Sequence, residues 1–184
     1  NVRPTAPDVV IVVAAVRTVD ATEGVILVRP TIPMGLRYGT FYSDVDQAAG
    51  STNTATAVTF DGTQSSNGVA IGTPTSRIVV AQAGYYQFSV SMQFTSSSSS
   101  AKNAYVWLRK NGTNVANSTS KLTNDANNAS LLLHEQFTIS LEIDDYIEIM
   151  WAVDDTALTL DAIPATAFSP AGHSVILNAV QLQL

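Results

Sequence analysis

Hydrophobic and polar residues alternate along several segments of the chain, which is the pattern of a β-strand with one buried face. In YYQFSVSMQFT (85–95), every second residue from Tyr86 to Phe94 is hydrophobic, and Gln and Ser residues lie between them. Segment 137–143 repeats the alternation. Its predicted inward-facing residues are Phe137, Ile139, Leu141 and Ile143. Both segments therefore predict half-buried antiparallel strands.

Two further strands are predicted at 146–153 and 174–184. The first of these, YIEIMWAV, is apolar on both faces apart from Glu148, so we expect it to be more deeply buried. Turn-forming dipeptides separate the predicted strands. The Asn-Gly pair at 111–112 is the strongest of them, because it supplies the positive φ angles of a tight hairpin. Short strands separated by such turns, without helical periodicity, predict an all-β antiparallel sandwich or barrel.

The run VVIVVAAV at 9–16 departs from this alternation, which predicts a strand covered on both faces. A second apolar run, VILV at 25–28, can pair with it, but a two-stranded hairpin cannot cover itself. We therefore expect residues 1–35 to form an extended N-terminal β arm that contacts another chain, and residues 36–184 to form the main domain. The predicted partner-binding residues are the β-branched ones: Val9, Val10, Ile11, Val12, Val13 and Val16.

The same run is a poor candidate for a membrane or targeting segment. Eight apolar residues are far fewer than the roughly 20 that a spanning helix needs. Arg3 is the only basic residue before the run, and Pro4, Pro7 and Asp8 occupy the place of a basic signal-peptide region. We therefore expect neither a membrane partner nor a secretory signal here.

Composition narrows the function further. Charged residues make up 13% of the chain, about half the usual share, and the net charge is −6. Lys and Arg are scattered, so we expect no nucleic-acid partner. The chain has no cysteine, which excludes disulfides, thiolate catalysis and cysteine-based zinc sites.

Few residues suggest chemistry. His134 and His173 lie on different predicted strands, and neither has an acidic or histidine companion at a spacing typical of a metal or catalytic site. The acidic pairs at 144–145 and 154–155 lie in predicted turns and match no calcium-loop pattern, although their oxygens leave calcium as an open alternative. We therefore predict no catalytic, cofactor-binding or metal-binding residue, and no enzyme.

Four segments carry a resemblance to a known superfamily. The first two are YGTFYSD (38–44), which is similar to the aromatic first strand of that superfamily, and SRIVVAQAGYYQFSVSMQF (76–94), which is similar to its signature strand pair. The other two are AYVWLRKNGTNV (104–115), which is similar to its Lys-Asn-Gly hairpin, and ISLEIDDYIEIMW (139–151), which is similar to its Leu-x-x-Gly-Asp element. Their order resembles that of the jelly-roll globular heads of complement-type and tumour-necrosis-factor-like proteins. It also resembles bacteriophage virion proteins that reuse this fold. One departure is Asp144, which stands where the family usually has Gly; Asp tolerates left-handed geometry better than most residues.

The resemblance implies an antiparallel jelly-roll sandwich of about ten strands. It also implies a homotrimer, because members of this superfamily usually pack flat aromatic and aliphatic faces around a threefold axis. The aromatic content of the chain is compatible with this. The residues expected at the trimer interface are Tyr38, Phe41, Tyr42, Tyr146 and Trp151.

The leading functional hypothesis is a non-enzymatic structural virion protein. We expect a trimeric decoration or cement protein on the capsid exterior, where its N-terminal arm binds the major capsid protein or another virion protein. The alternative is a receptor- or carbohydrate-binding head of a phage tail fibre or adhesin, which binds a host glycan. Segment 111–128 has the amides for such a site but no aromatic platform. A bacterial cell-surface or spore-surface protein of the same fold is a third hypothesis.

Overall fold

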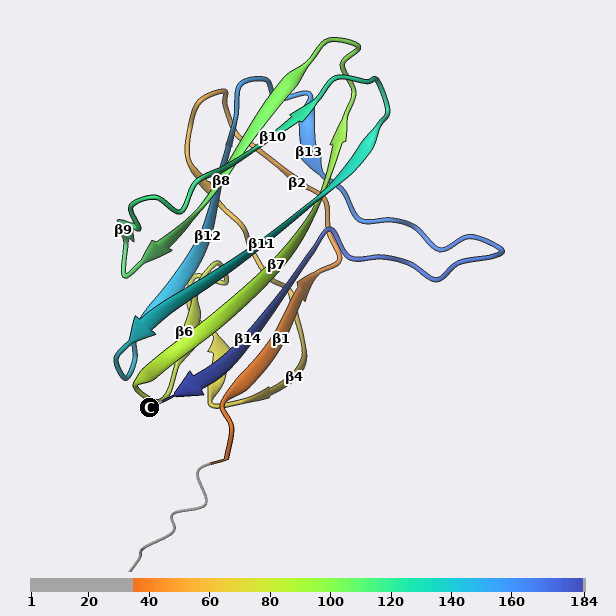
Figure 1. The fold of residues 1–184 in the computed structure, drawn as a ribbon. Coiled ribbons are helices and arrows are strands. Elements are labelled where there is room, and N and C mark those ends of the chain that lie inside the picture. The colour runs from red at the N-terminus through yellow and green to blue at the C-terminus, as the bar shows by residue number, and fades with distance from the viewer. Residues whose placement is uncertain (1–34, 184) are drawn as a thin grey trace, which may run out of the picture. The chain divides into compact units, whose positions relative to one another are not determined.

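A computed structural model describes residues 35–183. The chain divides into two units, Asn1–Gly35 and Leu36–Leu184. The arm and its six predicted partner-binding residues lie outside the described residues. In the described part the chain forms an antiparallel β-sandwich without helices (Figure 1). No helix in that part is long and apolar enough to cross a membrane.

The first sheet, called sheet A here, has β7 (Gly84–Ser96) near its centre. In sequence order its other long strands are β1 (Tyr38–Ser43), β4 (Gly62–Asn67), β11 (Ser130–Leu141) and β14 (Val175–Gln183). They lie in the spatial order β4-β1-β14-β7-β11, and Figure 1 shows β1, β14, β7 and β11 side by side. Two short strands extend the upper end of the sheet: β13 (Leu158–Leu160) pairs with β7, and β2 (Gln47–Ala48) pairs with β13.

The second sheet, sheet B, is centred on β12 (Tyr146–Val153) and β8 (Lys102–Lys110). Its other main strands are β5 (Val69–Ile71), β6 (Ile78–Val80) and β10 (Ser120–Asn124), in the order β10-β8-β12-β6-β5. Short strands β3 (Thr56–Ala57) and β9 (Thr113–Asn114) pair with β12 and β8. The described residues thus form fourteen strands in two sheets of seven, six of them only two or three residues long. The predicted all-β antiparallel sandwich is confirmed, with more strands than the roughly ten expected.

The core lies between the two inner sheet faces and follows the predicted alternation. Tyr86, Phe88, Val90, Met92 and Phe94 of β7 all lie inward and are buried. Trp151 of β12 packs edge-on against Phe94, with 5.8 Å between the ring centroids. Because strand residues two apart share a face, one strand from each sheet supplies this central aromatic contact.

One inward-facing prediction is wrong. Ile143 is 63% exposed, because β11 ends at Leu141 and residues 142–145 form the turn to β12. Leu141 is fully buried as predicted. Phe137 and Ile139 are only half-buried, because β11 lies at the edge of sheet A, where the two sheets separate.

The predicted turn chemistry is confirmed at two places. Asn111 and Gly112 have φ angles of 47° and 80°, the two positive values of a tight primed hairpin turn between β8 and β9. Asp144 has a φ of 64°, so it occupies the left-handed region where the resembled family has Gly. The two turns also contact each other, because the Asn111 side chain donates a hydrogen bond to Asp145.

A long excursion at 161–173 connects β13 to β14 and extends away from the sandwich (Figure 1). Ile163 and Gly172 close its base with two backbone hydrogen bonds of 2.9 and 2.8 Å. At the tip, the Thr166 hydroxyl accepts hydrogen bonds from the backbone N–H groups of Phe168 and Ser169. Phe168 is 92% exposed. The excursion is therefore a hydrogen-bonded hairpin with an aromatic tip.

Candidate functional site

The outer face of sheet A, called the sheet A face below, carries exposed hydrophobic side chains near both of its ends. On β1 and β14, Tyr38 lies opposite Val180. Leu182 and Tyr85 are exposed near the same end, and Leu132 of β11 is exposed toward the other. Exposed apolar side chains gathered on one sheet face are typical of an interaction site.

The centre of the sheet A face is polar. Thr40 donates a hydrogen bond of 2.8 Å to the side-chain oxygen of Asn178. His134 of β11 lies beside two hydroxyls of β7, with Nδ1 3.0 Å from Ser91 Oγ and Nε2 3.4 Å from Ser89 Oγ. Among the described residues no carboxylate contacts this imidazole, so the Ser-His pair has no third member of a nucleophilic triad there. The arrangement suits a polar interface centre better than catalysis.

His173 is a part of the excursion's base. Its Nδ1 contacts Asp44, and its ring stacks on Tyr42 with 4.3 Å between centroids. The backbone N–H of Asp44 donates to the Asp61 carboxylate. Because each of these contacts joins the excursion or β1 to a neighbouring loop, the histidine has a structural role.

The outer face of sheet B, called the sheet B face, contains a nearly buried carboxylate. Glu148 accepts a 2.7 Å hydrogen bond from Ser76 and lies 3.9 Å from the Arg109 guanidinium. Arg77 lies over the ring of Tyr146, 4.3 Å from its centroid. On the same face Tyr105 and Trp107 of β8 are half-buried beside β9 and β10. This face therefore carries both aromatic and charged side chains, whereas the outward positions of β1, β7 and β14 on the sheet A face carry no Asp, Glu, Lys or Arg.

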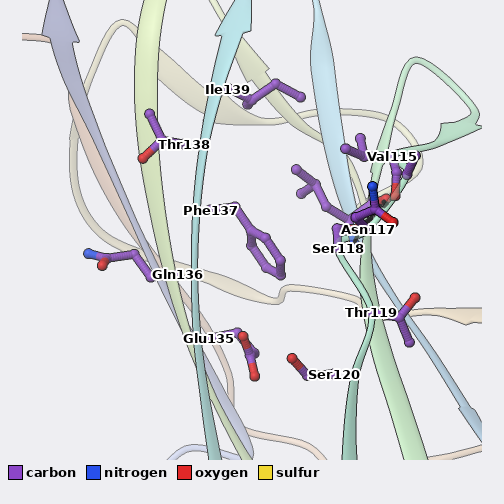
Figure 2. Close-up of a pocket in the computed structure, with 12 residues that line it drawn as sticks. Val115, Asn117, Ser118, Thr119, Ser120, Glu135, Gln136, Phe137, Thr138 and Ile139 are labelled. Atoms are coloured by element: carbon purple, nitrogen blue, oxygen red, sulfur yellow. Dashed lines mark hydrogen bonds between the residues drawn. The ribbon is translucent and has the colours of Figure 1, made fainter.

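A groove with a volume of about 330 Å³ lies where β11 separates from the β9–β10 segment (Figure 2). Leu108, Val115, Phe137 and Ile139 supply its apolar walls. Among the described residues that line it, Glu135 is the one titratable side chain. The Ser118 hydroxyl donates to Val115 O and accepts from the Leu108 N–H, so the fold already uses it. The described lining accordingly contains neither an acid-base pair nor an activated nucleophile.

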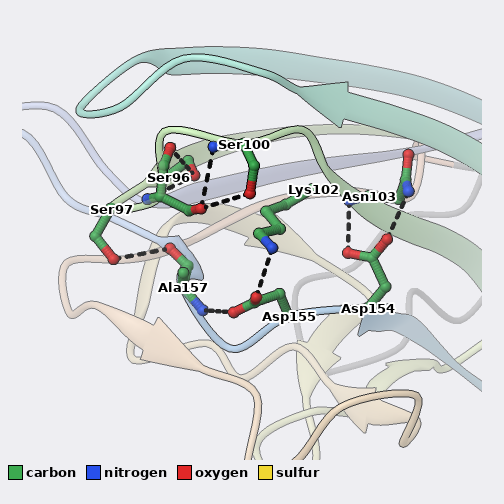
Figure 3. Close-up of polar contacts among 9 residues, drawn as sticks. Ser96, Ser97, Ser100, Lys102, Asn103, Asp154, Asp155 and Ala157 are labelled. Atoms are coloured by element: carbon green, nitrogen blue, oxygen red, sulfur yellow. Dashed lines mark hydrogen bonds and ion pairs between the residues drawn. The ribbon is translucent and has the colours of Figure 1, made fainter.

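The acidic turn residues are occupied by contacts within the chain. Asp154 accepts two hydrogen bonds from Asn103, and Asp155 lies 2.8 Å from Lys102 Nζ and accepts from the Ala157 N–H (Figure 3). The Lys102 hydrogen bond and that N–H lower the pKa of Asp155. In residues 35–183 no group of three or more His, Cys, Asp or Glu side chains is arranged to hold a metal ion.

Asp145 forms a denser network at the opposite end of the sandwich. Partial burial acts to raise its pKa, but hydrogen bonds from Lys110, the Glu142 N–H and Asn111 outweigh that effect and lower the pKa to about 2. Asn111 Oδ1 in turn accepts from the Tyr146 N–H at 2.9 Å. The network joins the β8–β9 hairpin to the β11–β12 turn.

The five residues expected at the trimer interface do not lie on one face. Tyr38 and Tyr42 lie on the sheet A face, whereas Tyr146 lies on the sheet B face. Phe41 and Trp151 are 0% exposed in the single chain, because their positions in the strand alternation point into the core. A side chain without accessible surface cannot contact a neighbouring copy, so these two assignments are corrected.

The comparisons with known proteins concern the fold. No protein-family model and no curated protein sequence matches the chain. The globular domain of zebrafish complement 1qA protein is similar in structure, with a TM-score of 0.51 and 13% identity over 80% of this chain and 98% of that one. Murine APRIL has a TM-score of 0.51 and 14% identity over 80% of this chain and all of that one. The fold is a jelly roll. At these identities the jelly-roll likeness shows the architecture alone.

Sequence reasoning missed how Tyr105 and Trp107 lie. The segment AYVWLRK (104–110) is apolar at both parities, so alternation alone does not say which face points inward. The charged residue could have settled the question, because Arg109 occupies the same set of alternate positions as Tyr105 and Trp107. A charged residue predicts that the strand face on which it lies is directed to solvent.

Proposed function

We propose that this chain is a non-enzymatic structural protein of a virus particle, which assembles as a homotrimer through the sheet A face and docks through its N-terminal arm. The observation that carries the assembly step is the cluster of exposed hydrophobic side chains on that face. Tyr38, Tyr85, Val180 and Leu182 gather near one end of it. Covering them removes apolar area from water, which is the usual driving force for subunit association.

The polar centre of the sheet A face is compatible with self-association. Hydroxyl and amide groups such as Ser91 and Asn178 are both donors and acceptors, so they can pair with polar groups on whichever surface of a neighbouring copy meets them around a threefold axis. An unpaired charge buried between copies would oppose association, and the outward positions of β7 and β14 carry no charged side chain. Neutral polar centres with apolar ends therefore favour contact between copies.

The virion assignment rests on the sequence. The composition is low in charge and rich in Ala, Ser, Thr and Asn, and the order of segments resembles phage virion proteins of this fold. The apolar run at 9–16 needs a partner to cover it. A capsid surface is a partner of that kind, so we place the protein on the capsid exterior as a decoration or cement protein.

The oligomeric state tests the assembly step. Size-exclusion chromatography with light scattering on the full chain is expected to give three times the 19.5 kDa chain mass. Val180→Glu should shift the protein to the single-chain mass, because it introduces a charge into the proposed interface. The matched control is Ile143→Glu, which changes an exposed residue in a turn outside the sheet A face. A monomeric wild type, or a Val180→Glu trimer, would contradict the proposal.

Shell binding tests the docking step. The full chain is mixed with empty shells of the phage that encodes it, and the bound fraction is measured by sedimentation. Ile11→Asp together with Val13→Asp should remove the protein from the shells and leave its trimer mass unchanged. A variant that still decorates the shells at full occupancy would overturn the role of the arm.

A further inference from the structure

Tyr105 and Trp107 form an aromatic platform on the sheet B face, in the middle of β8. They are two residues apart and both point away from the core, so they share one face and lie about 7 Å apart along the strand. Both residues are half-buried, so part of the surface of each stays accessible. We propose that this platform binds an oligosaccharide, with sugar rings stacked on Tyr105 and Trp107. The proposal is independent of the trimer and of the virion assignment.

The Trp107 indole is held in place by the β9 hairpin. Its Nε1–H donates a 2.9 Å hydrogen bond to Asn114 Oδ1, and Arg109 Nε donates to the same oxygen at 3.3 Å. These two bonds fix the orientation of the Asn114 amide, because only its oxygen can accept them. The indole therefore does not need to be ordered when a ligand arrives, which lowers the entropic cost of binding.

Polar groups lie beside the platform, where they can form hydrogen bonds with sugar hydroxyls. The Asn114 amide nitrogen has no hydrogen bond within the described residues and remains a donor next to Trp107. Lys121 of β10 lies opposite Tyr105, with Nζ 5.8 Å from the ring centroid. Beyond Tyr105, Asn103 is held by Asp154 and Thr123. A pyranose has apolar C–H faces and a rim of hydroxyls, and this arrangement offers aromatic faces to the former and amide, ammonium and hydroxyl groups to the latter.

The chemistry of the sheet B face favours a carbohydrate over a macromolecular partner. In the described part of the chain the exposed large hydrophobic residues lie outside β8, β10 and β12, so the face lacks the aliphatic surface of a protein interface core. The cations of this face each contact another side chain: Arg109 lies 3.9 Å from Glu148, Arg77 lies over the Tyr146 ring, and Lys121 lies over the Tyr105 ring. They therefore do not form the basic cluster that nucleic acid requires. Aromatic rings with amide and ammonium groups beside them match a sugar.

The two tryptophans of the chain make the test direct. Trp151 is fully buried in the core, so a Trp151→Phe variant leaves Trp107 as the single fluorescent tryptophan. The full-length protein is first applied to an array of immobilised neutral and acidic oligosaccharides of bacterial and animal origin. The soluble form of the strongest binder is then titrated into the single-tryptophan variant, and we expect a saturable change in Trp107 emission.

Substitutions distinguish this platform from other surfaces. Trp107→Ala and Tyr105→Ala should each weaken binding about tenfold or more, which corresponds to roughly 1.4 kcal/mol. Phe168→Ala is the matched control, because it removes an exposed aromatic ring from the excursion and should leave binding unchanged. Trp107→Tyr keeps an aromatic ring at this position, so it should retain part of the affinity that Trp107→Ala loses. Light scattering on every variant reports the oligomeric state separately. Wild-type protein that binds no oligosaccharide on the array, or binding that survives both alanine variants, would overturn the proposal.

Discussion

Lys110 Nζ lies 2.8 Å from the Asp145 carboxylate, so a residue at the end of β8 is tied to the turn that precedes β12. The same ammonium donates to the Ser140 carbonyl at 2.9 Å, and Asn111 donates to Asp145 at 2.6 Å. Neighbouring strands and their connecting turns are therefore joined by side chains as well as by the sheet hydrogen bonds.

The network predicts a pH dependence of stability. Because the pKa of Asp145 falls from 3.8 to about 2 on folding, its contribution is complete above about pH 4 and is lost as the pH falls from 4 to 2. Asp145→Asn should cost on the order of 1–2 kcal/mol at neutral pH after allowance for solvent screening. Urea unfolding at several pH values measures this, and a wild-type-to-variant difference that stays constant down to pH 2 would contradict it.

At Asp144, unlike at Asp145, one substitution is expected to increase the free energy of unfolding. A residue with side chain at a φ of 64° is strained relative to Gly. Asp144→Gly removes that strain but adds freedom to the unfolded chain, so we expect a gain of about 0.5 kcal/mol in the free energy of unfolding. Asp144→Val should lose roughly 1 kcal/mol or more, because β-branched residues tolerate this region poorly. Thermal unfolding of the two variants should show shifts in opposite directions.

Gly84 begins β7 with a φ of 150°, a conformation that side chains rarely adopt. A Cβ there would meet the Gln183 carbonyl and lie 2.7 Å from the Gln181 amide nitrogen. Gly84→Ala should therefore destabilise the pairing of β7 with β14 by about 2–3 kcal/mol. Hydrogen exchange would locate the loss: faster exchange at the end of β14, compared with β8, is expected, and uniform exchange in both strands would contradict it.

Trp151 tests how the core balances volume against hydrogen bonding. Its Nε1–H is buried without a partner in the described residues, and such a donor costs about 1–3 kcal/mol. Trp151→Phe removes the unpaired donor together with some volume, so we expect a change within about 1 kcal/mol. Trp151→Ala leaves a cavity beside Phe94 and should cost about 3–5 kcal/mol. A Trp151→Phe loss well above about 1 kcal/mol, measured by urea unfolding, would show that the lost volume outweighs the removal of the unpaired donor.

The architecture was predictable wherever one physical signal dominated. The alternation from Tyr86 to Phe94 fixed the inner face of β7, because only one parity is hydrophobic. The Asn-Gly pair at 111–112 likewise located the hairpin, since few other residues accept two positive φ angles in succession. Both are local properties, which a sequence displays directly.

The surfaces were harder to predict because they depend on several strands at once. Phe41 and Tyr42 are adjacent aromatic residues, and the sequence does not say that the first enters the core while the second faces outward. That outcome is fixed by the register of β1 against β14, where Phe41 lies opposite Leu177. The aromatic platform is similar, since Asn114 reaches Trp107 only after the hairpin has formed.

The hairpin at 161–173 leaves and re-enters the sandwich through a base closed by the Ile163–Gly172 pair. Because the tip beyond this base contributes no side chain to the core, the length and composition of 164–169 are free to vary without disturbing either sheet. A foreign peptide inserted within 164–169 would be displayed on the outside of the folded domain. The excursion is thus a natural position for an epitope or affinity tag.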